Sequence, residues 1–83
     1  MILELIHGQF SKKDAIEIIT QMIHVKIKFH ESKISNESNQ EDSKMRERRI
    51  KQLQRDLFEA RKYIEQETEK ISMQSEIKIL SKS

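Results

Sequence analysis

The segment from Ala15 to Ile34 carries apolar side chains over an unusually wide arc when it is drawn as a helix. At 100° per residue, its apolar positions form two adjacent rows that together cover about 200° of the helix surface, more than one neighbouring element can bury. The first row is Ile16, Ile19, Ile23, Ile27 and Ile34, and the second is Ala15, Ile18, Met22, Val25 and Phe29. We therefore expect this helix to need two packing partners.

The composition of the chain favours long helices. Its 83 residues include no proline, no cysteine and one glycine, Gly8, while 36% of them are charged. Few helix breakers and many charged residues are typical of helical proteins. A chain of this length forms one small domain whose own core is marginal. We expect a single helical domain over residues 1–83, with flexible or loosely packed ends at 1–10 and 73–83.

Local signals place the first helix at about 12–34. Ser11 is a good N-cap residue, because its hydroxyl can accept a hydrogen bond from a free backbone N–H of the first turn. Asp14 lies in that first turn, where a carboxylate interacts favourably with the positive end of the helix dipole.

A polar stretch at residues 32–43 predicts a turn at about 35–39, followed by a second helix at about 40–72. Asn36 is the best candidate for a left-handed C-cap of the first helix, and Ser38 or Asn39 can cap the second. A short connection between two long amphipathic helices is typical of an antiparallel helical hairpin.

The second helix has a narrow apolar seam, as in a coiled coil, and can cover only the first row of Ala15–Ile34. The seam consists of Ile50, Leu53, Leu57, Ala60, Ile64 and Ile71. The row of Ile18, Met22, Val25 and Phe29 is left over, and we predict that it forms the interface of a homo-oligomer. The predicted fold is all-α, a helical hairpin that associates as a dimeric four-helix bundle. A foreign protein on this row, or a monomer with the row exposed or covered by the chain ends, are the alternatives.

The chain ends permit two interpretations. The apolar residues from Ile71 to Ile79 recur with a period of two, as in a strand, whereas Met73, Ile77 and Leu80 also match a helix. A helical hairpin brings both ends together, so residues 2–6 and 76–80 could pair as short strands. We favour a frayed continuation of the helix and keep paired strands as the alternative.

The sequence shows no spacing of residues that is typical of a metal-binding or catalytic site. His7, His24 and His30 do not share the i, i+3 or i, i+4 spacing by which helices hold metals. A glycine-rich phosphate loop and a cysteine nucleophile are both missing from the sequence. We predict no catalytic, metal-binding or cofactor-binding residues, and a protein that is not an enzyme. His30 could still titrate inside the bundle and make the oligomer sensitive to acid.

A basic stripe on the second helix is the other functional candidate. Lys44, Arg48, Lys51, Arg55 and Lys62 project within about 60° of one another. Such a stripe could follow nucleic-acid phosphates with an affinity that falls as salt rises. Acidic residues lie between these basic ones and Phe58 is the one aromatic residue nearby, so we favour a solvated helix face.

Two hypotheses of function follow. The first is a non-catalytic interaction or scaffold protein that acts as a homodimer, with a second copy or an unidentified protein as its partner. The second is a small nucleic-acid-associated regulator that uses the basic stripe. The apolar opening segment is too short for a membrane span and carries Glu4, which argues against a signal peptide. We therefore expect a cytoplasmic protein without a membrane partner.

Overall fold

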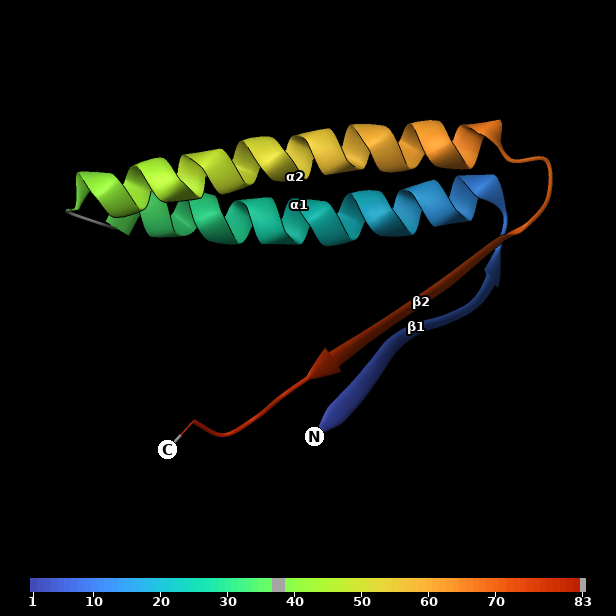
Figure 1. Cartoon of the computed structure of the whole chain (residues 1–83), viewed down its shortest axis with the longest axis horizontal. Helices are drawn as coiled ribbons and strands as arrows, with labels where there is room; N and C mark the ends of the chain where they lie inside the picture. The colour runs from blue at the N-terminus through green and yellow to red at the C-terminus, as the bar shows by residue number, and fades with distance from the viewer. Residues whose placement is uncertain (37–38, 83) are drawn as a thin grey trace.

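The computed structural model describes residues 1–36 and 39–82, which form two long helices and a two-stranded antiparallel sheet (Figure 1). The elements follow the order β1 (Ile2–Phe10), α1 (Lys12–Asn36), α2 (Gln40–Gln66) and β2 (Ile71–Lys78). The helices lie side by side and antiparallel, and the two strands leave the hairpin at the end where α1 begins and α2 ends and run back below it at an angle (Figure 1). The predicted helical hairpin is therefore present, but the fold is not all-α.

The predicted start of α1 is confirmed by its cap. The backbone N–H of Asp14 donates to Oγ of Ser11 at 3.1 Å. At its other end α1 runs two residues past the predicted boundary, to Asn36. The left-handed cap predicted at Asn36 is wrong, because Gly8 is the one described residue with a positive φ. Asn36 instead donates from Nδ2 to the backbone oxygen of Ser32 at 3.1 Å.

The start of α2 also matches the prediction. Asn39 is its N-cap, and Oδ1 of Asn39 accepts a hydrogen bond from the backbone N–H of Glu41 at 2.9 Å. The alternative cap, Ser38, and the middle of the predicted turn at 35–39 lie outside the described residues.

The core of the helical hairpin is thin. Among the described residues, Ala15 of α1 and Ile64 of α2 are buried, and no polar residue is. The apolar positions that the sequence assigned to the contact between the helices are half-buried: Ile16, Ile19, Ile23 and Ile27 on α1, and Ile50, Leu53, Leu57 and Ala60 on α2. The narrow seam of α2 thus packs along one side of α1.

The predicted continuation of the second helix to residue 72 is wrong, and so is the purely helical four-helix bundle built on it. The helix ends at Gln66, and the N–H of Glu67 donates to the backbone oxygen of Ile64 at 3.1 Å. The chain then turns into β2, which pairs with β1 from Phe10 opposite Ile71 to Ile2 opposite Lys78. A longer α2 would have run past the end of α1 with no helix beside it, whereas a strand satisfies its backbone groups against β1.

The paired strands, hereafter the ribbon, are longer than the alternative prediction of 2–6 with 76–80. Their pairing extends beyond β1 and β2, because the N–H of Ile79 donates to the backbone oxygen of Met1 at 2.8 Å. The register shifts between Glu4 and Ile6, where Leu5 has no partner on β2. The ribbon therefore contains a β-bulge near its free end.

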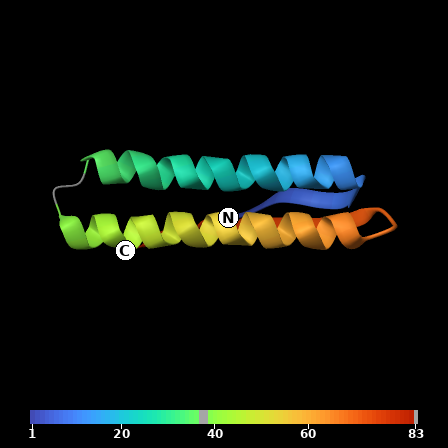
Figure 2. The same ribbon diagram turned by 90° about the horizontal axis from the view of Figure 1, so that it is seen from above.

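The ribbon contacts α1 near its base and then diverges from it (Figure 1), while it stays beneath the hairpin when the molecule is seen from above (Figure 2). The molecule is consequently extended, with Cα dimensions of 47 × 31 × 13 Å. Its radius of gyration is 15.5 Å, whereas a compact domain of this length has a radius of about 12 Å. The shortest dimension of the molecule, 13 Å, is about the width of two helices packed side by side, so the hairpin and the ribbon form two layers that open away from each other across the 31 Å dimension (Figures 1 and 2).

Candidate functional site

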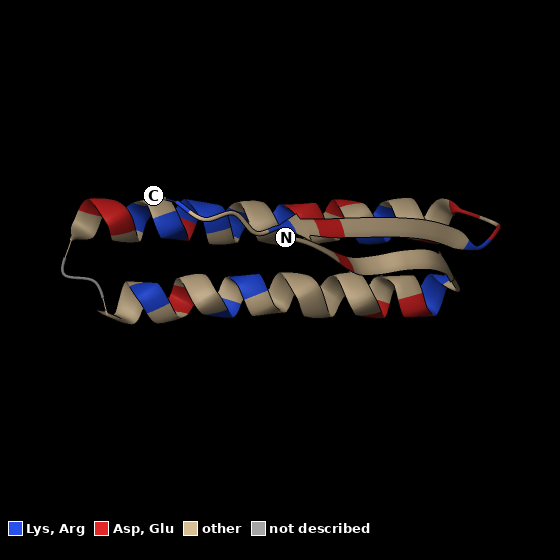
Figure 3. Cartoon of the chain, turned by 90° about the horizontal axis from the view of Figure 1, so that it is seen from below, with Lys and Arg blue, Asp and Glu red and all other residues tan. Residues whose placement is uncertain are grey.

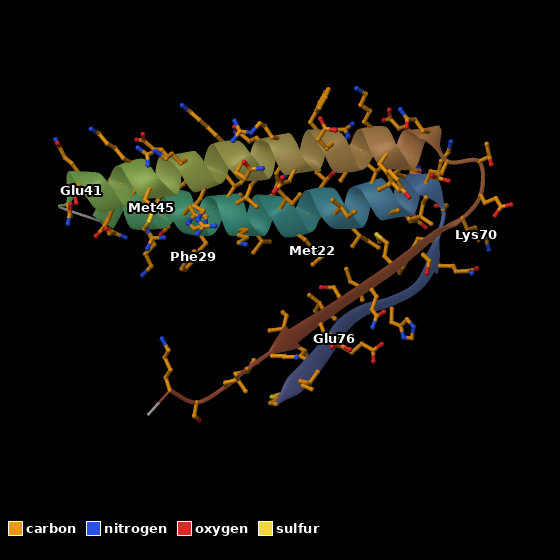
Figure 4. All side chains as sticks on the ribbon, in the orientation of Figure 1. Met22, Phe29, Glu41, Met45, Lys70 and Glu76 are labelled. Carbon is orange, nitrogen blue, oxygen red and sulfur yellow. The ribbon has the colours of Figure 1, made fainter. Side chains whose placement is uncertain are left out.

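The predicted interface row of α1 lies on the side of the helix from which the ribbon diverges. Ile18, closest to the base of the ribbon, is half-buried. Met22, Val25 and Phe29 are 36%, 68% and 54% exposed. Met22 and Phe29 point away from α2 toward the side of the ribbon, which does not cover them (Figure 4). Beyond Ile18, the row that the sequence left without a partner therefore stays largely open to solvent.

A second apolar surface lies on the ribbon and was not among the predicted site residues. Residues paired across two strands share one face, so the register divides the ribbon into two faces. The apolar face holds Met1, Leu3, Ile6, Gly8 and Phe10 of the first strand with Ile71, Met73, Ser75, Ile77 and Ile79 of the second. The opposite face holds mostly polar residues: Ile2, Glu4, His7 and Gln9 with Ser72, Gln74, Glu76 and Lys78.

The bulge at Leu5 keeps the apolar face continuous. Leu3 and Ile6 are three positions apart, so they would point to opposite faces of a regular strand. The extra residue restores the alternation, and Leu3 lies opposite Ile77 while Ile6 lies opposite Ser75. On β2 the alternation needs no correction.

The apolar face of the ribbon is the one turned toward the helices. Near the base, Phe10, Ile71 and Met73 on this face are half-buried, whereas Gln9, Ser72 and Gln74 on the polar face are exposed. Glu76, on the polar face, lies on the outer side of the ribbon (Figure 4). Toward the free end Leu3 and Ile77 become exposed as the ribbon leaves α1. Two apolar surfaces thus diverge from a common base and stay open to solvent.

Basic residues surround Phe29 where the helices approach their connection. The Nζ of Lys33 lies 5.6 Å and the Cζ of Arg46 lies 6.0 Å from the centre of the Phe29 ring, within the range of cation–π attraction. Lysine and arginine are frequent along this half of the hairpin (Figure 3). The sequence did not reveal this cluster, because only the packing of α1 on α2 brings residues 26–33 close to 46–49.

His30 belongs to this cluster. Its Nδ1 is 3.1 Å from Nη1 of Arg46, and because a guanidinium can only donate, Nδ1 must accept as part of a neutral imidazole. Removal from water, followed by the charges of Arg46, Lys26 and Arg49, lowers the pKa of His30 below its ordinary value of 6.5. His30 therefore contacts Arg46 of the other helix as a neutral imidazole, and its surroundings disfavour protonation of the ring.

The basic stripe lies on the outer face of α2, away from both apolar surfaces. All five predicted residues, Lys44, Arg48, Lys51, Arg55 and Lys62, are exposed. Phe58 lies beside the stripe, is 64% exposed and has Nζ of Lys62 at 5.9 Å from its ring centre. Shallow depressions flank Phe58, lined by residues such as Leu57, Arg61 and Glu59.

The histidines and carboxylates of the described residues gather into no metal site. Within residues 1–36 and 39–82, no three His, Asp or Glu side chains converge as a metal site would require. His7 Nδ1 contacts Glu4 Oε1 at 2.6 Å, but both side chains are more than half exposed on the polar face of the ribbon. Neither helix in the described part of the chain combines the length and apolar character of a bilayer-spanning segment.

Comparison with known protein families, curated proteins and solved structures finds no match to this chain. The candidate site therefore rests on the geometry alone.

Proposed function

We propose that this chain is a non-catalytic interaction protein that works as a homodimer, with the row of Ile18, Met22, Val25 and Phe29 at the centre of the interface. The observation that carries the proposal is the amount of surface that a single copy leaves open. One copy exposes 7145 Å², whereas a folded monomer of 10.0 kDa exposes about 5,200 Å². The excess of roughly 1,900 Å² is of the size that one subunit contributes to an obligate dimer.

The position of the exposed side chains supports the same proposal. Part of the exposed surface of α1 is apolar: Val25 and Phe29 leave more than half of their surface in water. Contiguous apolar surface of this kind marks interaction sites in soluble proteins. A second copy presents the same row, so a two-fold axis beside Val25 would bury both rows at once. The sequence-based expectation of a cytoplasmic location is part of this proposal.

The test compares two substitutions that add the same charge to two faces of α1 about 100° apart. Val25→Glu places a carboxylate in the row, whereas His24→Glu places one on the outer face. Because a dimer is favoured by mass action, the melting temperature of the wild type should rise with protein concentration. We expect Val25→Glu to abolish that dependence and to lower the melting temperature, and His24→Glu to preserve both.

Glutamate has a higher helix propensity than valine, so loss of stability in Val25→Glu cannot be ascribed to a weaker helix. Melting that is independent of concentration in the wild type, and unchanged in Val25→Glu, would refute the dimer.

A second candidate function is nucleic-acid binding through the basic stripe, and the exposure of Phe58 favours it. Aromatic side chains beside a basic groove stack on unpaired bases. Fluorescence anisotropy with duplex and single-stranded probes at low and moderate salt tests this candidate. Binding that weakens with salt, and weakens further in Lys51→Ala or Phe58→Ala but not in Lys70→Ala, beyond the end of α2, is expected. Absence of salt-dependent binding at micromolar protein eliminates it.

A further inference from the structure

We propose that the apolar face of the ribbon is the second half of the dimer interface, and that it packs on α1 of the second copy. This inference rests on the proposed homodimer and names how the two copies meet. Each ribbon would then cover the partner's helices, and the two copies would bury their open surfaces in one shared α/β core.

The ribbon is built for burial on one face only. Its apolar face is continuous from Phe10 to Leu3 on one strand and from Ile71 to Ile77 on the other, and the bulge at Leu5 maintains that continuity. An isolated two-stranded ribbon is marginally stable in water, and it needs packing against another layer. Within this chain that packing exists at the base alone, because Leu3 and Ile77 are exposed at the free end.

The area that one copy leaves open points to a second copy as the occupant, and the length of the ribbon fits that role. The nine residues of β1 span about 30 Å, whereas the row from Ile18 to Phe29 spans about 16 Å along α1. The ribbon is therefore long enough to cover the whole row of a second copy. One copy exposes roughly 1,900 Å² more than a folded monomer of its mass. The four side chains of the α1 row are too few to account for this area, so the ribbon must contribute to it.

The charges of the ribbon set its orientation in the dimer. Glu4, His7, Glu76 and Lys78 share the polar face, with Glu4 directly opposite Glu76. Burial of these groups would be costly without partners of opposite charge. The polar face therefore stays in water, and only the apolar face is available to a second copy.

The absence of cysteine from the sequence makes a disulfide test direct. One preparation carries Val25→Cys in α1, and a second, with an added mass tag, carries Ile77→Cys on the apolar face of the ribbon. The two are unfolded together, refolded and oxidised mildly, and the products are weighed by mass spectrometry. We expect a mixed disulfide between Val25→Cys and Ile77→Cys chains at several times the yield obtained with Gln74→Cys, the matched position on the polar face.

A chain that carries both Val25→Cys and Ile77→Cys provides the competing outcome. If the ribbon closes on its own α1, this chain forms the bond internally when diluted, and the inference is overturned. Equal yields from Ile77→Cys and Gln74→Cys overturn it as well.

A charge substitution separates this inference from the proposed function. Ile77→Glu should weaken dimerisation by about tenfold or more, whereas Gln74→Glu should leave it unchanged, in sedimentation at a series of concentrations. If the wild type is a dimer that Val25→Glu dissociates but Ile77→Glu does not, the homodimer stands and the role of the ribbon fails. A monomeric wild type refutes both.

Discussion

The helical hairpin and the ribbon are both amphipathic, but only the hairpin finds its apolar partner within the same chain. The seam of α2 packs along α1 and buries Ile64, whereas the ribbon contacts α1 near its base and leaves Leu3 and Ile77 exposed. α1 has one apolar surface of each kind, because α2 covers its first row and leaves its second row open. The difference separates the surfaces that the single chain buries from those that it leaves open to solvent.

The largest expected loss of stability comes from disrupting the contact between α1 and α2. Ile64→Ala removes a buried side chain from the seam between the helices, and we expect it to lower the free energy of unfolding by about 2–5 kcal/mol. Phe58→Ala, on the exposed outer face of the same helix, should change it by less than about 0.5 kcal/mol. Urea denaturation followed by circular dichroism measures both. Similar losses in the two variants would mean that the seam is not the core of the hairpin.

The sequence allowed the hairpin to be predicted because its signals are local. Ser11 and Asn39 are caps that act within one helical turn, and the seam from Ile50 to Ile64 repeats every three or four residues. The surplus row of α1 was visible for the same reason. Its use as an interface remains a prediction.

The ribbon was harder to predict because its signals are long-range. Residues 71–80 match a strand and a helix equally well, and the choice depends on β1, more than sixty positions away along the chain. The apolar face also depends on the bulge at Leu5, since Leu3 and Ile6 have the wrong spacing for a regular strand. Only the register shows that these residues share one face with Ile71, Met73 and Ile77.

A smaller effect should come from weakening the ribbon without touching its apolar side chains. Gly8 has a φ of 151°, which other residues adopt only with strain. A Cβ added at Gly8 would meet the Phe10 ring at 3.9 Å, an ordinary contact, so space is not limiting. We expect Gly8→Ala to cost about 1–3 kcal/mol through the backbone.

Hydrogen exchange locates this effect. Amides of β1 and β2 should lose protection in Gly8→Ala, while those in the middle of α1 and α2 should change less. Equal loss throughout the chain would show that the ribbon and the hairpin unfold as one unit, which would remove the contrast between them.

The smallest expected effect is on the pH dependence of stability, and it comes from His30 in the half of the hairpin farthest from the ribbon. Near the connection, His30 contacts Arg46, and its pKa is lowered by burial and by the surrounding basic residues. The unfolded chain therefore binds a proton at His30 at a higher pH than the folded chain does. The free energy of unfolding should fall as the pH drops below about 6.5 and level off below the pKa of folded His30.

His30→Gln keeps a neutral acceptor for Arg46 but cannot titrate. Its melting temperature should depend less on pH than that of the wild type between pH 7 and pH 5.5, where most carboxylates remain ionised. The same pH dependence in both proteins would assign the acid response to other groups.

The molar mass of the wild-type protein in solution tests the central claim most directly. Multi-angle light scattering on a gel-filtration column, at loading concentrations from micromolar upward, should give twice the chain mass of 10.0 kDa. A mass of 10.0 kDa at every concentration would contradict the claim that a second copy covers the open row of α1.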